Sequence, residues 1–104
     1  MITTDLHLYC KDYKFMNSIS DKIFTSGFWS FTLEEANAFI GCNVYFHNKL
    51  KEPSYRGGQI IAVEPKKYKD KERILFTIAE NNENIGKSWH GDVSIRQWYS
   101  IKHN

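Results

Sequence analysis

The sequence predicts an α+β fold: a small, strongly curled, mostly antiparallel β-sheet or barrel with two flanking helices. In the second half of the chain, segments rich in β-branched residues follow one another with connections of 9–12 residues, which is typical of antiparallel strands. In the first half, two segments space their apolar residues as helices do. With 104 residues, 41% of them hydrophobic, the chain is expected to form a single domain, 1–104.

The first half begins with a predicted strand at residues 5–9, where Leu6 and Leu8 alternate with His7 and Tyr9. The next segment, 11–24, predicts a helix that ends by Gly27. Its apolar residues follow a helical spacing: Phe15, Met16, Ile19 and Ile23.

A second helix is predicted to begin at Thr32. Thr32 and Glu35 form a capping box, in which each side chain covers a free backbone amide of the other residue. Gly41 is placed to end the helix in a left-handed conformation. The expected buried stripe is Leu33, Ala36, Phe39 and Ile40.

Strands are expected to dominate after this helix. The segments at 58–64 and 73–80 are apolar on both faces, so they are expected to be central strands. The link between them is too polar for a core element, and two long loops, 48–57 and 81–92, complete the layout. The four predicted strands are 43–48, 58–64, 73–80 and 93–101.

Composition limits the class of protein. Sixteen aromatic residues exceed what the packing of so small a domain needs, so some are expected to line a surface or pocket. No apolar run approaches the roughly 20 residues of a membrane helix, and the N-terminal residues do not resemble a signal peptide. Cys10 and Cys42 are expected to be free thiols in a reducing compartment, although a single bridge between them is the alternative. These features predict a cytoplasmic protein without membrane contact.

Charge is concentrated in residues 49–73, which hold eight lysines and arginines against four acidic residues. Because the whole chain has a net charge of only +2, this segment is the natural place for contact with phosphate. A solvated loop with ordinary lysines is the alternative interpretation.

The loop 81–92 contains a dense group of functional side chains: Lys87, Ser88, Trp89 and His90. It is not a nucleotide-triphosphate loop, because that motif needs glycine at position 81, where the chain has Asn81, and a helix after it. A cation, a hydroxyl, a stacking ring and an imidazole on one loop predict a ligand site. The alternative is that Trp89 covers the end of the sheet while its neighbours are solvated.

The loop 48–57 ends in Ser54, Tyr55 and Arg56, just before the pair Gly57–Gly58. Two glycines at the start of a strand suit a turn or bulge, but they also let a ligand approach the backbone closely. Tyr55 and Arg56 together are suited to hold a base and its phosphate. His47 lies beside this loop. No spacing of histidines, cysteines or carboxylates indicates a metal, a cofactor or a catalytic set.

Parts of the chain resemble small bacterial and phage proteins with PUA-like domains of the EVE and ASCH type. The resemblance covers about residues 26–91 and includes the aromatic entry at Trp29, the short helix ending at Gly41, the strand with Tyr45–His47, and the segments RILFTIAE and GKSWHG. It implies a curled β-barrel flanked by helices and an aromatic-lined pocket for RNA or a flipped, modified base. Trp29, Tyr55 and Trp89 are the positions assigned to its walls. Some ASCH-type members act as small hydrolases or nucleases.

Three functions follow. The first is a non-enzymatic module that binds a nucleotide or a base in nucleic acid. The second is a protein-binding or inhibitor module of the phage or bacterial conflict type, in which the aromatic residues form the interface. The third is a small nuclease or hydrolase that uses Lys87, His90 and a hydroxyl. The predicted ligand-binding residues are Trp29, His47, Ser54, Tyr55, Arg56, Lys87, Ser88, Trp89 and His90.

Overall fold

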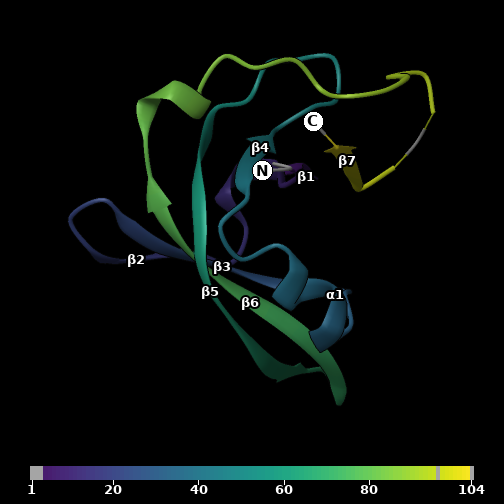
Figure 1. Cartoon of the computed structure of the whole chain (residues 1–104). Coiled ribbons are helices and arrows are strands. Elements are labelled where there is room, and N and C mark those ends of the chain that lie inside the picture. The colour runs from purple at the N-terminus through teal and green to yellow at the C-terminus, as the bar shows by residue number, and fades with distance from the viewer. Residues whose placement is uncertain (1–3, 96, 104) are drawn as a thin grey trace.

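The computed structural model describes residues 4–95 and 97–103, which form one mixed sheet of seven strands with one α-helix (Figure 1). This confirms a β-rich α+β fold. Two short 3-10 turns, η1 (Lys11–Tyr13) and η2 (Asn82–Asn84), complete the described elements. The strands and the helix are β1 (Thr4–Tyr9), β2 (Met16–Ser20), β3 (Ile23–Trp29), α1 (Leu33–Ala38), β4 (Asn43–His47), β5 (Arg56–Tyr68), β6 (Lys71–Glu80) and β7 (Tyr99–His103).

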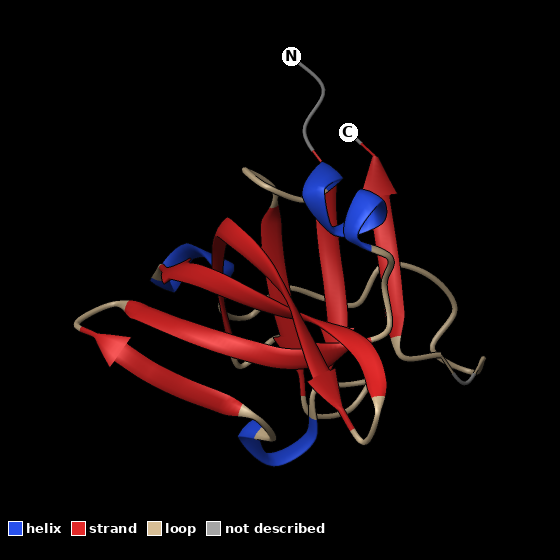
Figure 2. Cartoon of the chain, turned by 90° about the horizontal axis from the view of Figure 1, so that it is seen from below, coloured by secondary structure: helices blue, strands red, loops and turns tan. Residues whose placement is uncertain are grey.

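The strands lie in the order β2-β3-β6-β5-β4-β1-β7. Neighbouring strands are antiparallel except for β1 and β4, which are parallel and connected through the β2–β3 hairpin and α1. The sheet is strongly twisted, so the strands at one end cross those at the other (Figure 2). Over the described residues it stays open, with β2 and β7 at its edges, so of the two predicted alternatives the structure has the sheet and not the closed barrel.

The predicted helix at 11–24 is also wrong. The segment forms η1 and then the hairpin of β2 and β3, which turns at Asp21–Lys22. Spacing misled the prediction, since Ile19 of the supposed apolar stripe is 62% exposed. In β3, residues 24–27 are all buried, as expected for a strand with a neighbour on each side.

The capping box of α1 is confirmed. The Thr32 hydroxyl accepts a hydrogen bond from the Glu35 amide at 3.1 Å, and the Glu35 carboxylate accepts one from the Thr32 amide at 2.8 Å. After the helix, Gly41 has φ = +90°, as its predicted role requires. Ala36 and Phe39 are buried, whereas Leu33 and Ile40 remain about half exposed.

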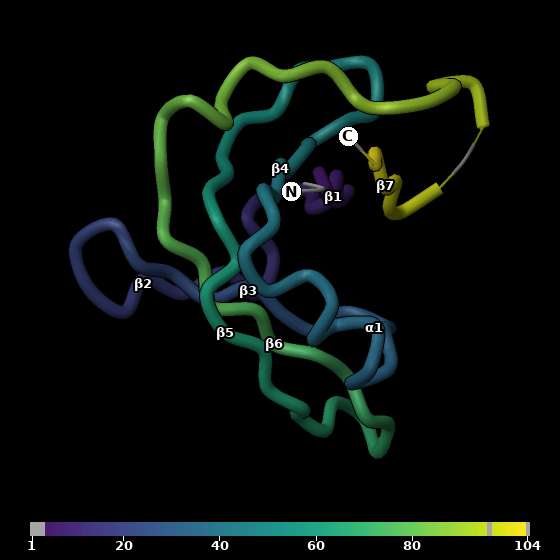
Figure 3. Tube along the Cα trace, in the orientation of Figure 1, coloured from purple at the N-terminus to yellow at the C-terminus, as the bar shows by residue number. Residues whose placement is uncertain are grey.

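The predicted central strands do lie inside the sheet, but β5 and β6 are longer than expected. The polar link at 65–72 continues their hairpin, which projects beyond α1 and turns at Lys69–Asp70 (Figure 3). Its residues are polar because solvent reaches both of its faces. The predicted strand at 93–101 includes residue 96, which lies outside the described residues, and among the described residues of this range the strand begins at Tyr99.

One face of the sheet carries the hydrophobic core. Leu6 and Leu8 of β1 and Val44 and Phe46 of β4 are fully buried, and they pack with buried residues of β3, β5 and β6. Because side chains alternate along a strand, the opposite face of β1 and β4 presents His7, Tyr45 and His47. That second face holds the candidate site.

We expect Thr32→Ala to lower the free energy of unfolding by about 1 kcal/mol, because the Glu35 amide loses its partner and the box opens. Urea unfolding followed by circular dichroism measures this. Thr32→Ser keeps the hydroxyl and is the control, with a much smaller loss. Equal losses for the two variants would show that the capping hydroxyl does not hold the helix.

Candidate functional site

Two histidines lie side by side on the second face of the sheet. In the parallel pair β1–β4, His7 lies opposite Tyr45, and Tyr9 lies opposite His47. His7 Nδ1 and His47 Nε2 are 2.8 Å apart, and the two residues are 4% and 0% exposed. The Tyr45 ring stacks on His7 with centroids 4.6 Å apart and planes at 19°.

A buried asparagine fastens the segment after β6 over this face. Asn84 of η2 donates from Nδ2 to the carbonyl oxygens of Val44 at 3.2 Å and Gly58 at 2.8 Å. A Cβ on Gly57 would overlap the Val44 carbonyl oxygen and come 2.7 Å from Asn84 Cβ, and a Cβ on Gly58 would overlap the Ala79 carbonyl oxygen. The glycine pair therefore allows close packing. It does not form a turn, and its backbone is not left-handed, since Gly57 and Gly58 are not among the glycines with positive φ.

Ser54 holds the two long loops together. Its hydroxyl donates to the Asn84 carbonyl at 2.6 Å and accepts from the Lys87 amide at 3.0 Å. Its own amide donates to the Lys87 carbonyl at 2.8 Å, and its carbonyl accepts from the Gly86 amide. The two loops run next to each other above β4 (Figure 3). Ser54 thus has a positioning role, setting where Lys87 and the three residues after it lie.

The covered face encloses a hollow of about 240 Å³, which we call the histidine hollow. Residues 87–90, predicted as a ligand loop, all line it, and the side chains of β1, β4 and β7 complete it. Ser100 of β7 donates a hydrogen bond to the His90 carbonyl and holds this end of the loop. The lining residues are Asp5, His7, Tyr45, Lys87, Ser88, Trp89, His90 and Lys102.

Hydrogen bonding fixes the proton positions on both imidazoles. His47 Nδ1 lies 3.0 Å from the Glu52 carbonyl oxygen, which only accepts, so Nδ1 of His47 carries a proton. Neutral His47 then accepts at Nε2, and the proton in the 2.8 Å contact belongs to His7 Nδ1. This leaves Nε2 of His7 as an unprotonated acceptor. Among the described residues no hydrogen bond reaches it, although His7 lines the hollow.

Electrostatics keep both rings neutral. Burial, and to a smaller extent the neighbouring His47, lower the pKa of His7 from its usual 6.5 to about 4. Burial also lowers the pKa of His47, which its bond to the Glu52 carbonyl partly offsets. At neutral pH the hollow is therefore lined by a neutral imidazole.

Trp89 covers the histidine pair from the loop side. Its ring meets His47 edge-on with centroids 5.1 Å apart and lies 5.9 Å from His7. The residue is 6% exposed, and within residues 4–95 and 97–103 its buried indole N–H has no hydrogen-bond partner. Trp89 is thus a wall over the histidine pair, and little of its ring is open to a stacking ligand.

Tyr55 and Arg56 do not reach the histidine hollow. The Tyr55 hydroxyl donates to the Cys10 carbonyl at 2.6 Å and its ring packs against the core. The Arg56 guanidinium binds Glu80 through Nε and Nη2 at 2.7 and 3.2 Å, and lies 3.7 Å from the centroid of Phe24. The expectation that these side chains share one pocket with the 87–90 loop is wrong, because both are engaged in packing.

Trp29 also lies away from the histidine hollow. Its indole N–H donates to the Ser26 hydroxyl at 3.0 Å, and its ring stacks at 5.9 Å on Trp98. It borders a different hollow, between the β1–β2 connection and the end of β3. His47 supports the site through His7 but does not line the hollow itself.

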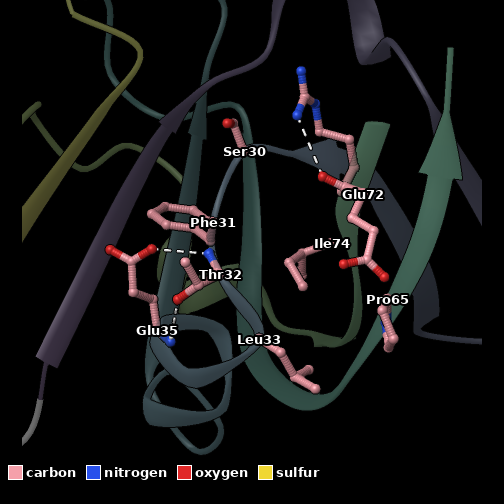
Figure 4. Close-up of a pocket in the computed structure, with 9 residues that line it drawn as sticks. Ser30, Phe31, Thr32, Leu33, Glu35, Pro65, Glu72 and Ile74 are labelled. Atoms are coloured by element: carbon pink, nitrogen blue, oxygen red, sulfur yellow. Dashed lines mark hydrogen bonds between the residues drawn. The ribbon is translucent and has the colours of Figure 1, made fainter. Parts of the chain in front are cut away.

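Another hollow, of about 360 Å³, lies beside the start of α1 (Figure 4). Part of its polar lining is already used: Glu35 and Thr32 cap the helix, and Arg73 donates to the Glu72 backbone carbonyl. Across the described part of the chain no group of three histidines, cysteines or carboxylates could hold a metal ion. Cys10 and Cys42 are free, as predicted.

Comparisons of the chain with family models, with curated proteins and with solved structures gave no match. The resemblance to PUA-like domains therefore stays a prediction. Within the described residues, no helix combines the length and the apolar character needed to cross a membrane.

Sequence reasoning missed four residues of the hollow: Asp5, His7, Tyr45 and Lys102. Part of the signal was present, because Tyr45 and His47 alternate with Val44 and Phe46 and so share a face. What the sequence did not reveal was the parallel pairing of β1 with β4, which places His7 against them.

We expect Gly57→Ala to lower the free energy of unfolding by roughly 1–3 kcal/mol, because the added methyl must displace Asn84 or the Val44 carbonyl. Ala62→Gly, an exposed change in the same strand, is the control for the ordinary glycine–alanine difference. A loss for Gly57→Ala no larger than this control would contradict the close-packing role.

We expect the pH dependence of stability to show the depressed pKa of His7. Unfolded chains protonate His7 below about pH 6.5, and folded chains do so only near pH 4. The contribution of neutral His7 to the free energy of unfolding is therefore complete above pH 6.5. It is lost as the pH falls toward 4, by on the order of 2–3 kcal/mol. Urea unfolding at pH 7 and 4.5 measures it. His7→Gln should flatten this change, whereas exposed His103→Gln should not. If the stability of His7→Gln were as pH-sensitive as that of the wild type, the lowered pKa would not belong to His7.

Proposed function

We propose that the chain is a non-enzymatic binding module that holds the phosphate and sugar of a nucleotide, either free or at the end of a nucleic acid strand, in the histidine hollow. The observation that carries the proposal is the unprotonated Nε2 of His7, a residue that lines the hollow and whose ring is oriented by the hydrogen-bond chain from the Glu52 carbonyl. Lys87 and Lys102, which line the same hollow, provide positive charge for the phosphate.

The cationic side chains of the hollow suit a phosphate. Lys87 and Lys102 line it from the loop and from β7, and both are exposed enough to move toward a ligand. In the described residues neither lysine forms an ion pair. The Ser88 hydroxyl and the His90 ring add hydrogen-bonding groups on the same loop. Charge-assisted hydrogen bonds from such groups are the strong contacts of phosphate sites.

The acceptors of the hollow require that the ligand also donates hydrogen bonds. Asp5 and the Nε2 atom of neutral His7 can only accept in their neutral-pH forms. Asp5 already accepts a hydrogen bond from Asn43 Nδ2 at 3.4 Å, but an inorganic anion alone would leave the Nε2 atom of His7 without a donor. Sugar hydroxyls next to a phosphate satisfy both requirements, which favours a sugar phosphate over a simple anion.

The size of the hollow indicates how much of the ligand enters. At about 240 Å³ it is smaller than the roughly 300–1,000 Å³ of typical small-molecule pockets. A phosphate with its sugar fits this scale better than a whole nucleotide, so the base would lie at the mouth. The buried Trp89 and Tyr45 rings then shape the hollow without sandwiching the base.

Isothermal titration calorimetry at pH 7.5 with a nucleoside 5′-monophosphate, the matching nucleoside and inorganic phosphate tests the proposal. We expect the monophosphate to bind at least tenfold more tightly than either part. Lys102→Ala should weaken its binding roughly tenfold or more, the scale of one hydrogen bond to a charged group.

Lys71→Ala, which removes an exposed lysine from the end of the β5–β6 hairpin, is the matched control and should leave the affinity unchanged. Equal affinity for the nucleoside and its monophosphate would show that the lysines do not read phosphate. Equal losses of affinity for Lys102→Ala and Lys71→Ala would show that the monophosphate does not bind in the histidine hollow.

A further inference from the structure

A second hollow, of about 190 Å³, opens where the β1–β2 connection meets the end of β3. We call it the aromatic hollow. It shares no lining residue with the histidine hollow. Four of its side chains are aromatic and two are lysines: its lining residues are Tyr9, Cys10, Lys11, Lys14, Phe15, Gly27, Phe28 and Trp29.

The aromatic surface continues from this hollow onto the hairpin of β5 and β6. Phe28 and Tyr68 stack with centroids 4.9 Å apart and planes at 12°, and Phe15 packs edge-on against both at 5.1 Å. All three rings remain partly exposed, and Tyr9 is 38% exposed. The domain therefore leaves a row of rings at its surface that the core does not use.

Lysines accompany these rings. Lys14 Nζ lies 5.3 Å from the centroid of Phe15, and Lys69 Nζ lies 5.3 Å from the centroid of Tyr68. Lys11, Lys14 and Lys69 form no ion pair among the described residues. The neighbouring acids in sequence, Asp12 and Asp70, do not line the hollow. The patch is thus both aromatic and positively charged.

We infer that the aromatic hollow and the adjoining Tyr68–Lys69 surface bind single-stranded nucleic acid, with an unpaired base against Tyr9, Phe15 and Phe28 and its phosphates on the lysines. Rings with interspersed cations are the usual platform for single strands, because every base has a face that can stack and every nucleotide brings a negative charge. A duplex keeps its bases stacked inside and cannot offer them to this surface. The inference does not depend on nucleotide binding in the histidine hollow.

The charge complementarity favours this occupant over a protein. A protein interface of this kind gains most from desolvated aromatic anchors, whereas here three unpaired lysines surround the rings and would have to be desolvated with them. A phosphate backbone neutralises them as it binds. Binding should then depend steeply on salt, which a mainly apolar protein contact would not.

Fluorescence anisotropy with the full chain and a 3′-fluorescein-labelled, ten-nucleotide oligothymidine bearing a 5′-hydroxyl tests the inference. The three lysines predict a slope of about −2 in log affinity against log salt, a loss of roughly 20-fold between 50 and 200 mM salt. Lys11→Glu/Lys14→Glu should weaken binding at 50 mM salt by at least about tenfold and make the slope shallower. Tyr9→Ala should weaken it by about fivefold or more.

Lys102→Glu is the matched control, because it reverses a charge in the histidine hollow and leaves the aromatic hollow intact. It should abolish monophosphate binding and leave the oligothymidine affinity unchanged, which separates the two proposals. Thermal unfolding verifies that each variant folds. Affinity that is flat with salt, equal binding of a blunt duplex, or equal losses for Lys102→Glu and Lys11→Glu/Lys14→Glu would each overturn the inference.

Discussion

The position of the candidate site depends on the close contact of Asn84 with the Gly57–Gly58 pair. The bare α-carbon of Gly57 lets the side chain of Asn84 reach the carbonyl oxygens of Val44 and Gly58, and that of Gly58 lets Ala79 of β6 approach closely. From this anchor the chain returns over β4, and Ser54 adds three further hydrogen bonds to Gly86 and Lys87. A loop without regular secondary structure is thus held as firmly as a strand, because its polar groups are paired inside the protein.

The same contact explains why a polar face of the sheet is buried. With the 81–92 loop fixed above β4, Trp89 packs against His7 and His47 and contributes to their burial. The carbonyl of Glu52, from the other long loop, then fixes the orientation of the pair. Three segments distant in sequence therefore set the protonation of one nitrogen atom. Neither loop could do so alone, since one supplies the cover and the other the acceptor.

Local chemistry could be predicted from the sequence, whereas pairing between distant strands could not. The Thr32–Glu35 capping box involves neighbours, so its residues alone determined it. The segment 11–24 had helical spacing, but the pairing of β2 with β3, and of β3 with β6, imposed strands on it from Met16 onward. For the site, the 87–90 loop was found because its residues are adjacent, whereas His7 was missed because only the parallel β1–β4 register gives it its partner. Tyr55 and Arg56 looked like ligand residues, since the sequence does not show that Cys10 and Glu80 satisfy them.

The buried histidine pair is costly unless it serves a purpose beyond packing. A protein interior is more stable with apolar residues of similar volume than with polar groups that lack partners. Here His47 has both ring nitrogens paired, but His7 has only one, and His7 lines a hollow together with two lysines. A site at which burial, hydrogen bonding and charge all act on one imidazole is where perturbed pKa values accompany function. Packing alone would not require Asp5, Lys87 and Lys102 around this nitrogen, whereas a ligand carrying both hydroxyls and phosphate would use all of them.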